Sequence, residues 1–281
     1  MPELPEVETM RRGLLPTIGG TIAAITEPEI PYRPIKIDPG IDEFRQRAIG
    51  AKIQAVDRIA KRVLVKLSTK DSIVMQPKMA GIAMIADPPS EQHTRIIFEI
   101  KNALVDRFLY WDRRGLGTVS LWNPAQVDEH LGPTQLGPDA SIVDEKTFIE
   151  RFRGIDREVK VAMLDQKLVC GIGNLYAAEI LHAAKVHPAI RCKAISKSIW
   201  KRIHRETIRI LNEAIAKEGS TLSDGTYRNA INGEGSYQNQ HLVYDRADEQ
   251  CLTCGKGIIQ RTVQAQRSTF YCPKCQKRKQ E

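Results

Sequence analysis

The chain opens with Met1-Pro2-Glu3-Leu4-Pro5-Glu6-Val7-Glu8-Thr9, and this stretch is the most specific feature of the sequence. Apolar residues then recur at the spacing of one helix face: Leu4, Val7, Met10 and Leu14. Proline suits the first turn of a helix, where its missing N–H would have no partner, and acidic residues suit that turn because of the helix dipole. The stretch therefore predicts a well-capped helix over residues 3–15.

The same stretch carries a candidate nucleophile. Excision of Met1 would leave Pro2 as a secondary amine at the helix N-terminus, where the helix dipole disfavours the cation and lowers a pKa that is ordinarily about 8. A neutral amine can attack an aldehyde-like carbon and form an iminium. Glu3 beside it, and Glu6 one turn further on, are candidate acid–base partners for such a reaction.

Length and charge limit the class of protein. The chain has 281 residues, 42% of them hydrophobic, so it can bury the cores of about two domains. No apolar run approaches the ~18 residues of a membrane span, and the acidic start does not resemble a signal peptide, so we expect a cytoplasmic protein without membrane contact. With 42 Lys and Arg against 34 Asp and Glu, the net charge is +8. This excess favours nucleic acid as partner, although a merely basic surface would explain it equally well.

Four of the six cysteines form two Cys-x2-Cys pairs near the C-terminus: Cys251, Cys254, Cys272 and Cys275. In a reducing compartment this spacing favours one structural Zn²⁺ with four thiolate ligands over disulfides or free thiols. The segment between the pairs, residues 258–271, is rich in strand-forming residues and predicts the β-hairpin of a zinc ribbon. Cys170 and Cys192 have no such partners and are expected in the core.

The hydrophobic pattern changes along the chain. We expect a domain over residues 1–135 that is strand-dominated apart from the opening helix, with strands at 21–25, 51–59, 63–67, 72–75, 94–100, 103–111 and 117–122. A Gly/Pro-rich stretch at 131–139 predicts the domain boundary. Helices are then expected at 145–153, 158–164, 175–184 and 196–218. A polar, Gly-rich mobile loop at 223–240 closes this second domain, residues 136–240, and the zinc ribbon with a basic tail occupies 241–281.

Four blocks of the sequence together resemble one family. These are the Pro-Glu-Leu-Pro-Glu opening with Arg11-Arg12-Gly13-Leu14 behind it, Leu164-Asp165-Gln166, Gly171-Ile-Gly-Asn174-Leu-Tyr-Ala177, and Gln266-Arg-Ser-Thr-Phe-Tyr-Cys272. The chain resembles the bacterial formamidopyrimidine-DNA glycosylases, which remove oxidised purines and nick the DNA. The resemblance extends over nearly the whole chain. The related endonuclease VIII, which prefers oxidised pyrimidines, usually has Gly between the two Pro-Glu pairs.

The resemblance implies catalytic roles for four residues. Pro2 would be the nucleophile at deoxyribose C1′, Glu3 its acid–base partner, and Glu6 would assist in the lesion pocket. Lys61, in a predicted hairpin, matches the family's phosphate-contacting lysine beside the lesion.

It also implies a DNA-binding set. Lys160 and Asn174 would grip the backbone through the helix–two-turn–helix motif, and Tyr244, Arg261 and Arg267 would contact backbone phosphates. Such contacts position a duplex without reading its sequence. The loop at 223–240 resembles the family's lesion-capping loop.

The residues that fill the space left by the extruded nucleotide depart from the family pattern. Met79 and Arg114 match the family's void-filling residues. Leu116 stands where a Phe wedge is usual, Gly115 replaces a second basic residue, and Gln76 replaces a His. An aliphatic wedge offers no aromatic stacking face, so we expect lesion search or opposite-base discrimination to differ.

The resulting prediction is an α+β multidomain repair enzyme. It would combine an N-terminal β-sandwich carrying the opening catalytic helix with a C-terminal helix–two-turn–helix domain and a zinc-ribbon hairpin. The partner would be double-stranded DNA with oxidised bases or abasic sites, bound between the domains, with no obligate protein partner and a monomer as the default. The alternatives are an endonuclease VIII-like enzyme and a non-catalytic zinc-ribbon protein that binds damaged DNA.

Overall fold

The computed structural model describes residues 2–222 and 225–278, and the chain divides into two compact units. Unit 1 comprises Met1–Gly132 and Ile215–Gln238, and unit 2 comprises Pro133–Ala214 and Asn239–Glu281. The division differs from the predicted domains because the segment after the last long helix returns to unit 1. Ile85 N–H, for example, donates to the Ala230 carbonyl at 2.9 Å.

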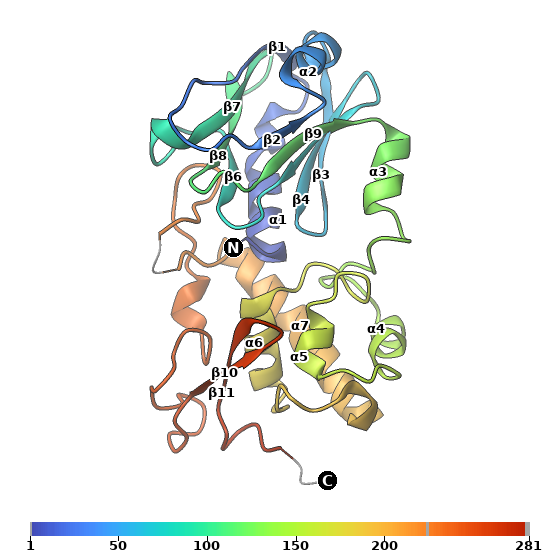
Figure 1. Cartoon of the computed structure of the whole chain (residues 1–281), viewed down its shortest axis with the longest axis vertical. Coiled ribbons are helices and arrows are strands. Elements are labelled where there is room, and N and C mark those ends of the chain that lie inside the picture. The colour runs from blue at the N-terminus through green and yellow to red at the C-terminus, as the bar shows by residue number, and fades with distance from the viewer. Residues whose placement is uncertain (1, 223–224, 279–281) are drawn as a thin grey trace. The chain divides into compact units, whose positions relative to one another are not determined.

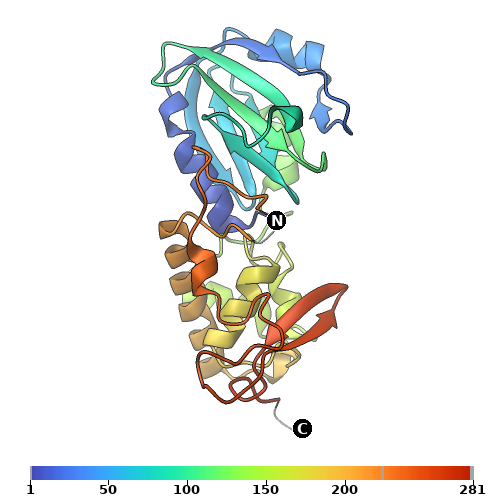
Figure 2. The same cartoon turned by 90° about the vertical axis from the view of Figure 1, so that its left-hand side faces the viewer.

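Unit 1 is a β-sandwich with the opening helix α1 (Leu4–Gly13) packed into it (Figures 1 and 2). One sheet has the order β1-β7-β8-β6 and the other β2-β9-β5-β4-β3. The strands are β1 (Thr21–Thr26), β2 (Lys36–Asp38), β3 (Ile53–Ile59), β4 (Arg62–Leu67), β5 (Ser72–Gln76), β6 (Gly81–Met84), β7 (Thr94–Lys101), β8 (Arg107–Asp112) and β9 (Thr118–Trp122). All neighbouring strands are antiparallel except β2 and β9.

One apolar core joins both sheets to α1. Val7, Met10 and Leu14 are fully buried in the same cluster as Phe98 and Phe108, whose rings stack with centroids 4.4 Å apart. The three helix residues occupy the face that the 3–4 spacing predicted, so burial of that face holds α1 in place. The predicted sandwich and opening helix are confirmed.

The expectation of one helix in the first 135 residues is wrong, because the structure also has α2 (Ile41–Ala48) and α3 (Pro124–Leu131). Helix α2 buries Phe44 and Ala48 and has acidic residues in its first turn. Helix α3 begins with a capping box in which Asn123 Oδ1 accepts the Gln126 N–H at 3.0 Å. Both starts have local signals that the strand-rich surroundings outweighed in the sequence analysis.

Unit 2 is helical, with a small hairpin at its C-terminal end. Its helices are α4 (Glu145–Phe152), α5 (Val159–Met163), α6 (Asn174–Ala183) and α7 (Lys197–Ala216), the last of which ends in unit 1. Across both units, short 3₁₀ turns lie at Leu15–Thr17, Glu91–His93, Cys192–Ala194 and Tyr237–Gln240. The helices occur where the apolar periodicity predicted them.

The predicted zinc-ribbon hairpin is confirmed as β10 (Gln260–Gln264) paired antiparallel with β11 (Arg267–Tyr271). Ala265 and Gln266 form the turn with φ angles of 46° and 60°. This left-handed two-residue turn matches the natural twist of a hairpin. It places Arg267 at the first position of β11.

Candidate active site and nucleic-acid interface

The start of α1 is built by a capping box that lies directly after Pro2. Glu3 is the N-cap residue, and its N–H donates to Glu6 Oε2 at 2.9 Å. Pro2 is buried, and both carboxylate residues are 3% exposed. Because the box fixes the backbone at Glu3, Pro2 is held at the positive end of the helix dipole. Met1 lies outside the described residues.

Glu6 also connects α1 to the segment that follows α7 and belongs to unit 1. Its second oxygen, Oε1, accepts the Ser220 N–H at 2.9 Å. Gly219 precedes this contact with φ +79°, and a Cβ there would lie 2.8 Å from Glu6 Oε1. Glycine is therefore required at residue 219, both for its backbone conformation and for the close approach of the carboxylate.

Tyr227 adds a second connection between the same two segments. Its hydroxyl donates to the Glu218 carbonyl at 3.0 Å, and the backbone carbonyl of Glu6 lies 3.5 Å away. Burial and the neighbouring Glu6 charge raise the pKa of Tyr227 well above its ordinary value, so the hydroxyl stays protonated. The described part of the predicted loop, residues 225–240, thus packs within unit 1 up to Gln238, while residues 223–224 lie outside the described residues.

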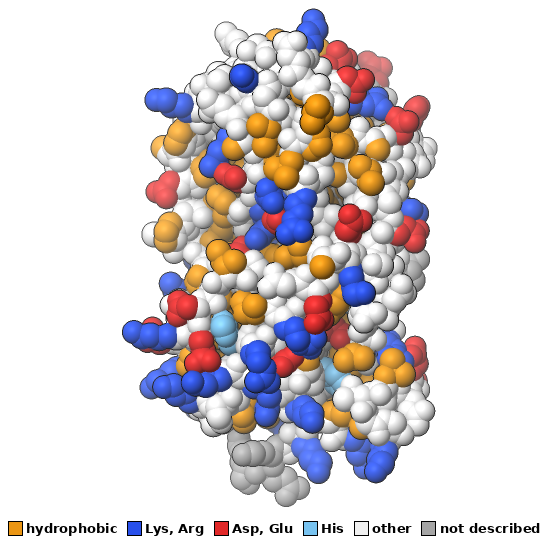
Figure 3. All heavy atoms as spheres, turned by 180° about the vertical axis from the view of Figure 1, so that it is seen from behind, with side chains coloured by type: hydrophobic (Ala, Val, Ile, Leu, Met, Phe, Trp, Pro, Cys, Tyr) orange, Lys and Arg blue, Asp and Glu red, His pale blue; other side chains and the backbone are white. Residues whose placement is uncertain are grey.

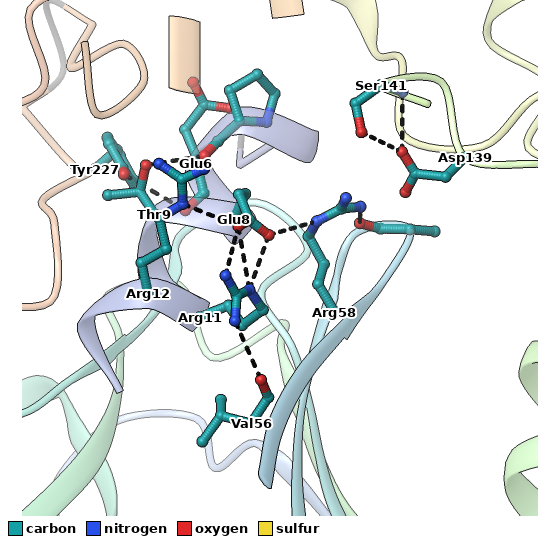
Figure 4. A network of polar contacts seen from close by, with 12 residues as sticks. Glu6, Glu8, Thr9, Arg11, Arg12, Val56, Arg58, Asp139, Ser141 and Tyr227 are labelled. Atoms are coloured by element: carbon teal, nitrogen blue, oxygen red, sulfur yellow. Dashed lines mark hydrogen bonds and ion pairs between the residues drawn. The ribbon is translucent and has the colours of Figure 1, made fainter. Parts of the chain in front are cut away.

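Glu8 of α1 accepts hydrogen bonds from three arginines, two of α1 and one of β3 (Figure 4). Arg11 donates to its carboxylate at 2.8 Å, Arg12 at 3.0 Å and Arg58, from β3, at 3.1 Å. Burial raises the pKa of Glu8, but the hydrogen bonds and charges of the arginines outweigh this and lower it to about 2. Glu8 is therefore ionised throughout the physiological pH range.

Arg58 extends this cluster to the hairpin that carries Lys61. One of its amino groups donates to the Ala60 carbonyl at 3.1 Å, in the turn between β3 and β4. Ala60 has φ 51°, and Lys61 follows it as a half-buried residue. The hairpin turn and the N-terminus lie at the same end of unit 1 (Figures 1 and 2). Arg58 thereby ties the position of the Lys61 turn to that of α1.

In unit 2, the turn before α6 is organised by Gln166. Its amide oxygen accepts the Gly171 N–H at 2.9 Å, and its amide nitrogen donates to the Ile172 carbonyl at 2.9 Å. Gly171 has φ +104°, which favours glycine. Asn174 then begins α6, where helix N–H groups lack partners within the helix and can bind an anion.

Lys160 is fully buried, which the sequence analysis did not anticipate. Its ammonium donates to Asn174 Oδ1 at 2.6 Å, Thr269 Oγ1 at 2.7 Å and the Ser268 carbonyl at 3.1 Å. Asn174 Nδ2 donates to the same Ser268 carbonyl at 3.0 Å. Lys160 therefore joins the α6 turn to β11, and a direct phosphate contact by it stays a prediction that would require an exchange of partners.

The two arginines of the finger hairpin, Arg261 and Arg267, differ in the part of the residue that is held in place. Arg261 is exposed on β10 and donates to Ser268 Oγ at 2.9 Å. Arg267 is exposed at the start of β11, next to the residue whose carbonyl Lys160 and Asn174 both hold. The backbone of Arg267 is thus positioned by unit 2, while its side chain stays accessible.

Tyr244 is positioned by a buried carboxylate of α6. Glu179, 2% exposed, accepts the N–H groups of Leu242, Val243 and Tyr244 at 2.9, 3.0 and 2.7 Å. Burial raises the Glu179 pKa, and the three hydrogen bonds offset part of that rise. The Tyr244 ring packs edge-on against the ring of Phe270 of β11, with the ring centroids 5.3 Å apart.

The four finger cysteines fit a tetrahedral zinc site. Zinc–sulfur bonds of about 2.3 Å imply an edge of about 3.8 Å between ligand sulfurs. The Sγ–Sγ distances are 3.8 Å for Cys251–Cys275 and 3.8 Å for Cys254–Cys272, far longer than the ~2.05 Å of a disulfide. All four ligand atoms lie within 4.8 Å of one another. They hold one structural Zn²⁺.

Three domain families match consecutive parts of the chain. These are the formamidopyrimidine-DNA glycosylase N-terminal domain over residues 1–119, the formamidopyrimidine-DNA glycosylase H2TH domain over 132–226, and the zinc finger found in FPG and IleRS over 248–278. A formamidopyrimidine-DNA glycosylase of Streptococcus pyogenes is 37% identical over 284 residues, covering 99% of this chain and all of the relative. The chain belongs to the formamidopyrimidine-DNA glycosylase family.

Solved structures agree with this assignment. The Lactococcus lactis Fpg bound to DNA with an abasic site superposes with a TM-score of 0.87 at 30% identity, covering 99% of this chain and 100% of that one. A point mutant of the same enzyme, bound to DNA containing Fapy-dG, gives 0.87 at 31% identity with the same coverage. The predicted fold is confirmed by these likenesses and by the family matches.

The loop that departs from the formamidopyrimidine-DNA glycosylase pattern has a structural reason for its glycine. Gly115 has φ +60°, and a Cβ there would lie 2.4 Å from the Arg33 carbonyl oxygen. Arg95 donates to that oxygen at 3.0 Å and to the Asp112 carbonyl at 2.8 Å. A basic side chain at residue 115 would therefore displace a neighbouring backbone segment.

Asp112 shapes the rest of this loop. Its fully buried carboxylate accepts the Arg114 N–H at 2.9 Å and the Gly117 N–H at 2.6 Å. The Arg114 side chain is exposed and Leu116 is half-buried. Met79, in the turn between β5 and β6, is 39% exposed. These three predicted void-filling residues all reach the surface of unit 1.

Several positioning residues escaped the sequence analysis: Glu8, Arg58, Asp112, Glu179 and Ser220. The i, i+3 and i, i+4 spacing of Glu8 with Arg11 and Arg12 is a signal that could have identified the first. Nothing local in the sequence marks the buried carboxylate of Asp112 as the cap of the loop that bears Arg114. Among residues 2–222 and 225–278, the structure has no helix that is both long and apolar enough to cross a membrane.

Proposed function

We propose that this chain excises oxidised purines, such as 8-oxoguanine and formamidopyrimidines, from duplex DNA and cuts the strand through a Schiff base on Pro2. The observation that carries the proposal is the helix start, where Pro2 lies buried beside Glu3 and its capping box. A relative named formamidopyrimidine-DNA glycosylase matches this chain over its full length, and solved relatives bind abasic-site and Fapy-dG DNA.

The chemistry follows from the amine at the helix N-terminus. After Met1 is removed, the helix dipole favours the neutral amine of Pro2, whose nitrogen attacks C1′ of the damaged nucleotide. The N–C1′ bond forms as the glycosidic bond breaks, and Glu3 supplies the proton for the departing base or the ring oxygen. The nitrogen loses its proton, and the C1′–O4′ bond then breaks with a proton delivered to O4′, which converts the aminal to an iminium. The iminium acidifies C2′, so β- and then δ-elimination follow and leave phosphates on both sides of a one-nucleotide gap.

The other predicted residues would hold and open the duplex. The base must leave the stack before C1′ can be reached. Met79, Arg114 and Leu116 would fill the vacated space. Glu6 would lie in the lesion pocket, since its carboxylate accepts the Ser220 N–H from the segment that follows α7. The proposed phosphate contacts come from Lys61, Lys160, Asn174, Tyr244, Arg261 and Arg267.

The zinc ion is structural in this scheme. Its four thiolates close the coordination shell, so the metal supplies no chemistry and instead holds the hairpin that bears Arg267. Four thiolate ligands in their reduced form are typical of a reducing compartment, which supports action on DNA in the cytoplasm. The proposal needs no protein partner.

Trapping with borohydride tests the proposal. Protein whose N-terminus is confirmed by mass spectrometry would be incubated with duplexes carrying 8-oxoguanine, a formamidopyrimidine, an oxidised pyrimidine or an abasic site. We expect a covalent complex that maps to Pro2 and forms best with the two purine lesions. Glu3→Gln should still trap on the abasic site but lose trapping on the intact lesions.

Two other results would contradict the proposal. Preferential trapping on the oxidised pyrimidine would indicate an endonuclease VIII-like specificity. Tight binding of damaged DNA without any covalent complex would leave only a damage-binding protein.

A further inference from the structure

Unit 2 contains a cavity of about 1200 Å³ that the proposed function does not use. Its walls come from the end of the segment before α5, from α5 itself, from residues 185–196, from the beginning of α7, and from Lys277 and Arg278 after the zinc finger. All of these segments belong to unit 2, so the cavity is a feature of one compact part of the protein.

The lining of this cavity is strongly cationic. It has two carboxylates, Asp156 and Glu158, against seven basic side chains: Arg157, Lys185, Arg191, Lys193, Arg202, Lys277 and Arg278. The seven cations minus the two anions leave five positive charges, whereas the whole chain has a net charge of +8. This local surplus of positive charge favours an anionic occupant.

Only part of this charge is neutralised within the protein. Asp156 accepts from Arg191 and from Lys193, both at 2.8 Å, and so holds these side chains together at the wall. Within the described residues, no carboxylate lies within ion-pair distance of Lys185, Lys277 or Arg278. On the face drawn in Figure 3, Lys and Arg side chains are prominent over the lower part of the picture, which belongs to unit 2.

The two basic residues at the rim are attached to a fixed point. Gln276 before them is 1% exposed, and its amide nitrogen donates to the Val186 carbonyl at 2.8 Å. Its amide oxygen accepts the Cys272 N–H at 3.0 Å. The zinc finger thereby anchors the chain just before Lys277, and the cationic rim begins from a rigid base.

The rest of the lining is apolar. Val161, Ile190, Ile195 and Ile199 contribute to it, together with smaller aliphatic residues. Val161 follows Lys160 on α5, and successive helix residues point about 100° apart. The cavity therefore lies on a different side of α5 from the Lys160–Asn174 cluster that faces the finger hairpin.

We propose that this cavity binds an acidic peptide segment of a partner protein, one that carries apolar side chains among its carboxylates. The carboxylates would meet Lys185, Lys277 and Arg278, and the apolar side chains would cover the isoleucine-lined floor. A DNA duplex fits less well, because it presents phosphates and sugars on its outside and keeps its bases stacked, which leaves the apolar floor without a matching group.

Fluorescence anisotropy with a labelled decapeptide tests this proposal on the full-length, zinc-loaded protein. The probe alternates Glu and Leu, and the comparison peptide replaces each Leu by Ser. We expect saturable binding of the first and at least about tenfold weaker binding of the second, since the floor contributes through apolar contact. The double variant Lys277→Glu/Arg278→Glu should weaken binding by about tenfold or more, as expected for reversed rim charges.

A matched control reverses two exposed lysines of unit 1, Lys52→Glu/Lys101→Glu, and should bind the Leu-containing probe as the wild type does. Equal binding of both peptides, or equal loss in both double variants, would reduce the cavity to a nonspecific cationic surface and overturn the proposal. Displacement of the probe by an undamaged duplex at equal charge concentration would assign the site to nucleic acid instead. Base excision measured on the same samples reports separately on the proposed function.

Discussion

Two buried charges organise the two units, and they are satisfied in opposite ways. Glu8 in unit 1 is surrounded by the guanidinium groups of Arg11, Arg12 and Arg58. Lys160 in unit 2 donates to the neutral oxygens of Asn174, Ser268 and Thr269. The first cluster pairs one carboxylate with three cations. In the second, one cation on α5 joins the start of α6 to strand β11.

The difference separates two uses of positive charge in a DNA-binding protein. The Glu8 cluster keeps a surplus of cations, and the Arg12 side chain is 56% exposed, so the cluster can still attract phosphate. The Lys160 cluster exposes no charge of its own. It instead fixes the position of Asn174 and of the strand that bears Arg267. The Glu8 cluster therefore contributes positive charge, whereas the Lys160 cluster contributes geometry.

Removal of zinc should have the largest effect on the protein, because the metal supplies folding free energy of about 10 kcal/mol or more to such fingers. We expect Cys275→Ser, or treatment with a strong chelator, to unfold the β10–β11 hairpin and to weaken DNA binding by about a hundredfold, since the Lys160 acceptors on β11 are lost. Circular dichroism and DNA titration measure both. Retained affinity without zinc would show that the hairpin is dispensable for DNA binding.

Substitution of Glu8 tests the first cluster. In Glu8→Gln the three arginines lose their shared carboxylate and repel one another, so we expect the free energy of unfolding to fall by about 3 kcal/mol. Urea unfolding measures the change. Glu129→Gln, on the exposed surface of α3, is the matched control and should change stability by less than about 0.5 kcal/mol.

Substitution of Lys160 tests the second cluster. Lys160→Met keeps the aliphatic stem but removes the donor to Asn174 Oδ1 and Thr269 Oγ1, while the Ser268 carbonyl keeps Asn174 Nδ2. We therefore expect a loss of about 2 kcal/mol in the free energy of unfolding, measured by urea unfolding. Thr269→Val should reproduce part of this loss.

The salt dependence of DNA binding separates positioning from direct contact at Lys160. If Lys160 only positions its neighbours, the slope of log K against log salt concentration stays unchanged in Lys160→Met. A slope reduced by about 1 would mean that the ammonium reaches a phosphate in the complex. Lys167→Met, an exposed lysine of the same unit, is the control.

The smallest expected effects concern how the free energy of unfolding depends on pH through His241 in unit 2 and Glu8 in unit 1. Burial, with a contribution from Arg246, lowers the pKa of His241 in unit 2 to about 4. The unfolded chain binds this proton near pH 6.5, so the His241 contribution is complete above that pH and is lost as the pH falls toward 4.

Glu8 behaves differently, because its folded pKa is about 2 and its ordinary value is 4.5. Its contribution is present above pH 4.5 and is lost as the pH falls toward 2. The stability difference between wild type and His241→Gln should therefore shrink between about pH 7 and 4.5, while the difference for Glu8→Gln should hold until below pH 4.5. Urea unfolding at about pH 7, 5 and 3 measures both, and identical profiles would contradict the assignment.

Features that depend on neighbours in the sequence could be predicted without the structure. The capped helix after Pro2 and the zinc ligands need only local spacing, as do the finger hairpin and most strands of the sandwich. Helices α2 and α3 belong to the same class, because Asn123 and the acidic start of α2 are local signals that were outweighed. In each case the signal lies in residues a few positions apart, such as a cap, a Cys-x2-Cys pair or an alternating apolar pattern, even where the element later pairs with a distant one.

Only the tertiary structure decided which polar groups meet across the chain. The Glu6–Ser220 contact joins residues 214 positions apart, and the Lys160–Thr269 contact joins residues 109 apart. The sequence does mark Lys160 as basic, but a lysine has three donors whose partners are set by whatever segment packs against it. Its burial against β11, like the contacts of Ser220 and Tyr227 with Glu6 of α1, follows from the packing of distant segments, which no local pattern encodes.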